Sequence, residues 1–83
     1  MRKKEGLLTQ RIEDGLIVYD PQADEAYVLN ETGALVWENA ELSEEEIAAI
    51  IAERYDVGKD EAAEDARAFL AELVGKGLLL RDG

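Results

Sequence analysis

The stretch YVLNETGALVW, Tyr27 to Trp37, carries a strand pattern that runs directly into a helix pattern. Tyr27 and Leu29 are separated by one residue and begin the period of two that is typical of a half-buried strand. Asn30 ends this alternation, and its short side chain can cap the free N–H groups of a following helical turn. An apolar run continues to Trp37, so the stretch predicts a strand joined to a helix without a spacer.

Two further strand patterns precede this stretch. They cover Leu7–Ile12 and Leu16–Tyr19, and the strand of the opening stretch covers Glu25–Leu29. Short turn sequences around Gly15 and Pro21 separate the three patterns. Two short connections in succession predict an antiparallel meander in which Glu25–Leu29 is an edge strand.

Three helix patterns follow the strands. The first covers about Glu31–Asn39. The sequence SEEE, which begins at Ser43, is a capping box that opens a second helix to about Tyr55. A third helix is expected to begin with Asp60 as its cap and to be ended by Gly75-Lys76-Gly77, in which Gly77 is suited to a left-handed cap.

The 83 residues are therefore expected to form a single α+β domain. Residues 1–6 are expected to be a loose, charged lead-in, and Leu78–Leu80 a short extended tail.

The charge of the chain argues against nucleic acids and membranes as partners. Nine Lys and Arg residues stand against twenty Asp and Glu residues, which gives a formal net charge of −11. Phosphate backbones and anionic lipid surfaces both repel such a chain. No stretch approaches the ~20 apolar residues of a membrane span. A cytoplasmic protein is the expectation that follows.

The residue types argue against an enzyme. The chain has no cysteine and no histidine, and Ser43 is its only serine. This composition removes a thiolate nucleophile, the usual general base and the commonest metal ligand. Asp20 and Asp24 share a turn, but the glycine and the terminal glutamate of a calcium loop are missing. Neither a metal site nor a cofactor is expected.

The third helix carries two apolar rows. At ~100° per residue the core stripe is expected to consist of Ala62, Ala66, Phe69 and Leu73. The second row consists of Ala63, Arg67, Leu70 and Val74. This row is either part of a broad arc facing the core or one wall of a groove whose other wall is the edge strand.

Three motifs resemble the PqqD-like family. They are LNETGALVWE (Leu29–Glu38), the capped SEEEI helix start, and DARAFLAELVGKGLL (Asp65–Leu79). The family comprises RiPP recognition elements, which are small peptide chaperones of pathways that modify ribosomally made peptides. The resemblance covers about residues 7–81 and implies a winged helix-turn-helix-like fold, with a three-stranded antiparallel sheet packed on three helices.

The resemblance also implies a function. In the family, the leader peptide of a precursor adds as an extra strand to the third strand and lies against the third helix. The residues carried over as peptide-binding are Glu25, Ala26, Tyr27, Val28, Leu29, Ala63, Arg67, Leu70 and Val74. The implied partners are this leader peptide and a separate modifying enzyme, and the chain itself would be non-catalytic.

Departures from the family pattern bear on the pathway. The member that serves pyrroloquinoline quinone synthesis carries Cys-Asp-Gly where this chain has Glu38-Asn39-Ala40. The run TGALVW is more similar to the stand-alone proteins of lasso-peptide clusters, which deliver the leader to a peptidase. Another modified-peptide pathway, including that of pyrroloquinoline quinone, and a general protein–protein adaptor remain as alternatives.

A helix-turn-helix DNA-binding protein and a small acidic carrier protein fit the sequence less well. The third helix has an excess of acidic residues, which a phosphate backbone would repel. Ser43 is explained as a helix cap rather than as an attachment site.

Overall fold

The computed structural model describes residues 1–81. Its main sheet has three strands, β2 (Leu8–Ile12), β3 (Gly15–Asp20) and β4 (Glu25–Asn30), in the order β2-β3-β4. Both pairings are antiparallel, with Gln10 opposite Ile17 and Ile17 opposite Val28. The predicted α+β class, the meander and the edge position of β4 are confirmed.

The junction after β4 is direct, as the sequence predicted. Helix α1 (Glu31–Glu38) begins at the residue that follows β4. Asn30 is the last residue of β4 and also the N-cap of α1, and its Oδ1 accepts a hydrogen bond of 2.7 Å from the N–H of Gly33. One side chain therefore ends the strand and starts the helix.

Two more helices complete the fold. Helix α2 (Glu44–Tyr55) begins with the predicted capping box, in which Ser43 Oγ accepts from the N–H of Glu46 and the Glu46 carboxylate accepts from the N–H of Ser43, both at 3.1 Å. Helix α3 (Lys59–Gly75) begins two residues earlier than a cap at Asp60 predicts. Its N-cap is Gly58, so the predicted cap by Asp60 is wrong.

Gly77 has the left-handed conformation expected of it, with φ of 77°. The chain then continues into β5 (Leu79–Leu80), which pairs with β1 (Arg2–Lys3) in a separate two-stranded sheet. This pairing differs from the loose lead-in expected for residues 1–6. A two-residue strand has no periodic signal in the sequence, and its partner lies at the other end of the chain.

The N-terminal segment is also held by side-chain and terminal contacts. The Nζ of Lys4 lies 2.6 Å from a carboxylate oxygen of Asp20 on β3, and the ammonium group of Met1 donates to the carbonyl of Ala40 at 3.0 Å. The ring of Trp37 lies 4.3 Å from the Nζ of Lys3.

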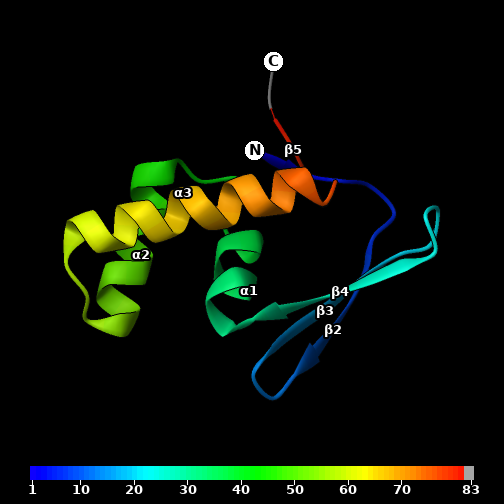
Figure 1. Cartoon of the computed structure of the whole chain (residues 1–83), viewed down its shortest axis with the longest axis horizontal. Coiled ribbons are helices and arrows are strands. Elements are labelled where there is room, and N and C mark those ends of the chain that lie inside the picture. Colours follow the sequence, from blue (N-terminus) through cyan, green and yellow to red (C-terminus); the bar gives the residue numbers. More distant parts are fainter. Residues whose placement is uncertain (82–83) are drawn as a thin grey trace.

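The helices cover one face of the sheet. Figure 1 shows α3 crossing above α1, with α2 near its N-terminal end and the sheet extending from the other side of α1. Leu16 and Val18 of β3 and Leu29 of β4 point to this side and are almost fully buried. They belong to one hydrophobic core with the buried residues of all three helices and with Leu78 and Leu79.

Gly15 allows β3 and β4 to approach closely. A Cβ atom on this residue would lie 1.9 Å from the carbonyl oxygen of Leu29. Because that neighbour is backbone, Gly15→Ala should lower the free energy of unfolding by about 1–3 kcal/mol, the cost of a forced backbone shift. Gly75→Ala is the matched control, since nothing lies within 4 Å of its Cβ. It should raise stability by about 0.5–1 kcal/mol through helix propensity. Equal effects of the two substitutions in urea unfolding would contradict this account.

The contact between Lys4 and Asp20 should make stability depend on pH. The hydrogen bond from Lys4 lowers the pKa of Asp20, with further help from the N–H groups of Ala23 and Gln22 and against the effect of burial. A folded pKa below the unfolded value, ~3.9, stabilises the fold above that value, and this stabilisation is lost as the pH falls through the folded pKa. We expect Asp20→Asn and Lys4→Gln each to lower stability at pH 7 and to approach the parent protein at pH 2–3. Unfolding curves give the stability of each variant and of the parent protein at each pH. A stability difference that stays the same across this pH range would count against the pairing.

Candidate functional site

The second edge of β4 is a free backbone surface of the main sheet. β4 pairs with β3 on one side, and no other strand within residues 1–81 pairs with its second side. In an antiparallel edge strand every second residue directs its N–H and C=O groups away from the sheet. The six residues of β4 therefore offer a short ladder to an extended chain.

The side chains of β4 alternate between the two faces of the sheet. Leu29 is buried and Tyr27 is half-buried on the face that the helices cover. Val28 and Ala26 lie on the opposite face and are exposed. All five strand residues predicted to bind a peptide, Glu25–Leu29, thus belong to the edge strand.

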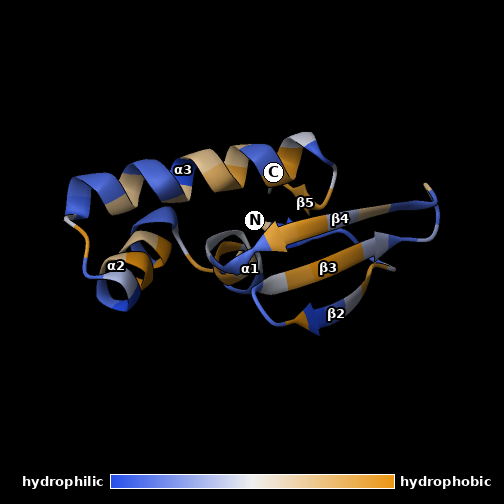
Figure 2. Cartoon of the chain, turned by 60° about the horizontal axis from the view of Figure 1, so that its bottom comes forward, coloured by the Kyte–Doolittle hydropathy of each residue, from blue (hydrophilic) through white to orange (hydrophobic). Residues whose placement is uncertain are grey.

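Helix α3 passes along the free edge of β4. Figure 2 shows α3 on the β4 side of the sheet, with β2 at the far side. The ring of Phe69 lies against Gly33, where a Cβ atom would be 3.3 Å from the nearest ring carbon. The Nζ of Lys76 lies 5.9 Å from the centre of the Tyr27 ring. The side of α3 that carries Phe69 and Lys76 is therefore the side nearest to the edge.

Charged groups surround the ring of Tyr27. Its hydroxyl donates a short hydrogen bond to the carboxylate of Glu25, and this bond, together with partial burial, raises the pKa of the Tyr27 phenol. On the helix, Lys76 is paired with Glu72 at 2.9 Å, one turn away. The edge thus carries the half-buried ring of Tyr27 and the ammonium group of Lys76, whose partner Glu72 is exposed to solvent.

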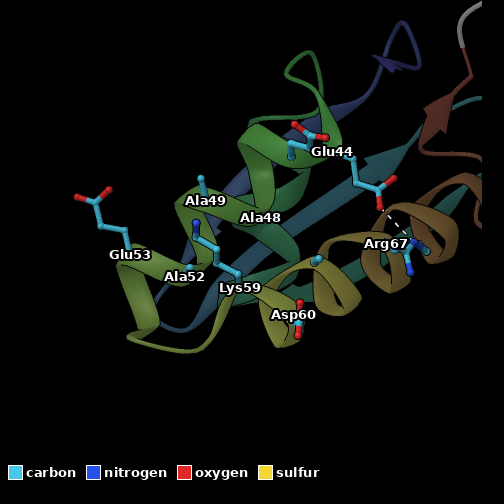
Figure 3. Close-up of a pocket in the computed structure, with 10 residues that line it drawn as sticks. Glu44, Ala48, Ala49, Ala52, Glu53, Lys59, Asp60 and Arg67 are labelled. Carbon is cyan, nitrogen blue, oxygen red and sulfur yellow. Dashed lines mark hydrogen bonds and ion pairs between the residues drawn. The ribbon is translucent and has the colours of Figure 1, made fainter.

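The structure divides the helix row that the sequence predicted as the second wall. Ala63 and Arg67 line a groove of about 980 Å³ between α2 and α3, and the guanidinium of Arg67 bonds to Glu44 of α2 at 3.1 Å (Figure 3). Leu70 is only 5% exposed and belongs to the core, and Val74 is half-buried and packs against the core. At ~100° per residue this row lies about 100–160° around the helix axis from Phe69, with Arg67 the farthest.

The core stripe of α3 needs a matching correction. Ala62, Ala66 and Leu73 are buried as predicted, but Phe69 is half-buried and Leu70 takes the fourth core position. The helical period correctly separates the two sides of α3. The period does not show which side of α3 meets α2 and which meets β4. That arrangement decides which residues of α3 lie beside the edge strand.

The other edge of the sheet lacks a comparable wall. β2 is also unpaired on its outer side within the described residues. Its helix-side residues Thr9 and Arg11 are both exposed. A peptide paired with β2 would therefore bury little apolar surface, which singles out β4.

Neither a metal site nor a membrane span is found within residues 1–81. No group of three or more acidic residues within residues 1–81 is placed to hold a metal ion. None of the helices in this part of the chain is both long enough and apolar enough to cross a bilayer.

Solved structures share this fold along their whole length. One is described as TbiB1 in complex with the TbiA(beta) leader peptide, and it is 25% identical, covers 100% of this chain and 99% of its own, and has a TM-score of 0.86. Another, lasso peptide synthetase B1 complexed with the leader peptide, is 23% identical, covers 96% of each chain and has a TM-score of 0.84. The second likeness concerns the fold alone.

Sequence comparison gives the family. No curated protein matches the chain significantly. The family model of coenzyme PQQ synthesis protein D (PqqD) matches residues 15–79, a span that runs from the first residue of β3 to β5. This span contains β4, all three helices and the three motifs of the resemblance. The chain therefore belongs to the PqqD family.

Proposed function

We propose that the protein is a non-catalytic peptide chaperone that binds the leader peptide of a ribosomally synthesised precursor. The leader adds as a fourth strand to the free edge of β4 and lies against the side of α3 that carries Phe69 and Lys76. The unpaired edge beside this helix carries the proposal. The leader-peptide complex of the 25% identical structure supports it.

Backbone pairing alone would bind weakly and without selectivity. Four or five hydrogen bonds at a net ~0.5–1.5 kcal/mol each contribute ~2–7 kcal/mol. Association and ordering of a flexible peptide cost at least ~4 kcal/mol. Apolar leader side chains that become buried add ~1.5–3 kcal/mol each, so two or three of them bring the affinity to the micromolar range or better.

The side of α3 that carries Phe69 and Lys76, here called the helix wall, therefore determines which leader sequence binds. Phe69 and Tyr27 offer aromatic surface that is already half-buried in the empty protein. Lys76 can exchange its exposed Glu72 partner for an acidic leader residue at little cost, because exposed ion pairs within a helix contribute only ~0.3–0.5 kcal/mol. This wall replaces Ala63, Arg67, Leu70 and Val74, since the first two face α2 and the last two pack against the core.

The bound leader would keep the core peptide near a second enzyme. The chain makes and breaks no bond; it raises the effective concentration of the precursor at the enzyme. We propose a leader peptidase of lasso-peptide biosynthesis as that enzyme, in the cytoplasm. The similarity of the run TGALVW to the stand-alone proteins of lasso-peptide clusters supports this assignment.

Pyrroloquinoline quinone synthesis is the second candidate, because the matching family model is named for it. The Cys-Asp-Gly of that pathway's member is replaced here by Glu38-Asn39-Ala40. Binding of that pathway's precursor peptide in preference to a lasso leader would decide for this candidate.

Strand addition predicts a period of two in amide protection. On titration with the leader encoded beside the gene, alternate amides within Glu25–Asn30 should exchange with solvent at least tenfold more slowly, because they become hydrogen-bonded. Amides of β2 at the other edge, Leu8–Ile12, are the internal control and should not change. Uniform protection, or protection confined to α1 and α2, would contradict strand addition. NMR-detected hydrogen exchange measures both edges in one sample.

The two sides of α3 should differ in their effect on leader binding. Phe69→Ala removes apolar surface worth ~1.5–3 kcal/mol and should weaken binding about 10- to 100-fold. Arg67→Ala on the opposite side of the same helix should leave the affinity within about twofold. Isothermal titration calorimetry gives the affinities, and circular dichroism checks that both variants are folded. The reverse order of effects would restore the row of Ala63 and Arg67 as the peptide wall.

A further inference from the structure

The face of the main sheet that points away from the helices is apolar. The pairing registers assign its members, because residues directly opposite each other in an antiparallel pair point to the same side. The apolar members are Leu8, Ile12, Ile17, Tyr19, Ala26 and Val28. We call these six residues the outer face. Leu8 and Val28 are 60% and 68% exposed, the largest exposures among the bulky apolar residues of the fold.

Strand β2 is oriented against its own amphipathic pattern. Its apolar residues Leu8 and Ile12 lie on the outer face, whereas Thr9 and Arg11 point to the side of the helices. A strand with one solvated face normally turns its apolar residues inward. Shifting the register by one residue would reverse this, so the observed register exposes apolar side chains that burial would have favoured.

No charged residue interrupts the outer face. The remaining outward positions of the three strands, all of which the structure describes, are Gln10, Gly15 and Asn30. In the whole chain 35% of residues are charged. Depletion of charge within an apolar patch is characteristic of the centre of a protein–protein interface.

The charge of the chain argues for a different protein as the occupant, rather than for a second copy. Two copies meeting through this face would each bring a net charge of −11, with Glu13 and Asp14 in the turn at one end of the sheet and Asp24 in the turn at the other. A folded partner with an apolar centre and a basic rim complements the same surface.

The outer face is continuous with the edge that receives the leader. Ala26 and Val28 belong both to this face and to β4. A leader added to β4 would direct alternate side chains toward α3 and toward the outer side, because side chains alternate along a strand. The bound leader would therefore extend the outer face by one strand.

The size of the face makes this extension important. Three strands at ~4.8 Å spacing and five residues at ~3.3 Å rise give a projected area of about 240 Å². The uneven surface of the side chains is larger than this projected area. Even twice the projected area is well below the ~800 Å² that each partner contributes to a standard interface. A fourth strand enlarges the face by about a third.

From these observations we infer that the outer face is the docking surface for the enzyme that processes the leader-bearing precursor, and that the leader paired with β4 completes this surface. The inference rests on the proposed function. It adds that the enzyme recognises the loaded chaperone in preference to the empty one, through apolar contacts on the sheet and basic groups around them.

The test measures binding of the leader peptidase encoded with the precursor to the full chain, with and without leader. Leu8→Lys and Gln10→Lys place a charge on the outer side of β2, the strand farthest from the leader. Both positions are exposed, so folding should be preserved. Thr9→Lys is the matched control, because it adds the same charge to the opposite side of the same strand at another exposed position.

We expect the peptidase to bind the loaded parent chain at least fivefold more tightly than the empty one, and less tightly at higher salt. Leu8→Lys and Gln10→Lys should weaken that binding tenfold or more while leader affinity stays within twofold, and Thr9→Lys should change neither. Peptidase affinity that is the same with and without leader, or unaffected by both outer substitutions, overturns the inference. So does a dimer in sedimentation equilibrium that Leu8→Lys dissociates, since the occupant would then be a second copy. Failure of the parent chain to bind leader would instead refute the proposed function.

Discussion

The hydrogen bond from the N–H of Gly33 to the side chain of Asn30 is the interaction on which the geometry of the fold depends. Asn30 closes the ladder opposite Gly15 and caps α1 in the same conformation. No loop lies between strand and helix, so the position of α1 fixes the orientation of the whole sheet. Gly33, one turn into the helix, leaves space for the ring of Phe69 from α3. Sheet, first helix and third helix are thus joined within four residues.

This junction leaves the edge of β4 free while keeping it close to a helix. A strand at the edge of a sheet is a risk for aggregation unless it is short, charged or covered. Here the strand is short, and Glu25 and Lys76 place charges beside it. These features make indiscriminate pairing unfavourable, yet an extended peptide with suitable side chains can still pair with the backbone. The same arrangement serves stability and the proposed recognition.

The two faces of the sheet have different roles in this account. The helix-covered face supplies the core through Leu16, Val18 and Leu29. The outer face contributes little to the core, and its apolar residues are retained in a chain that is otherwise rich in acidic groups. A leader strand would share both faces, because half of its side chains would point to each. Under the proposed function, a small domain thereby connects recognition of a peptide to recognition of an enzyme.

The sequence by itself determined the meander, the direct join at Asn30, the capping box at Ser43 and the left-handed cap at Gly77, because all of these depend on local periodicity or on hydrogen bonds within a few residues. It also indicated the edge strand and the family. Only the tertiary structure decided which side of α3 meets β4, that Phe69 rather than Arg67 lies there, and that the ends of the chain pair as β1 and β5. A helical period fixes angles around an axis but not the rotation of that axis against its neighbours, and two-residue strands form only when packing brings distant segments together.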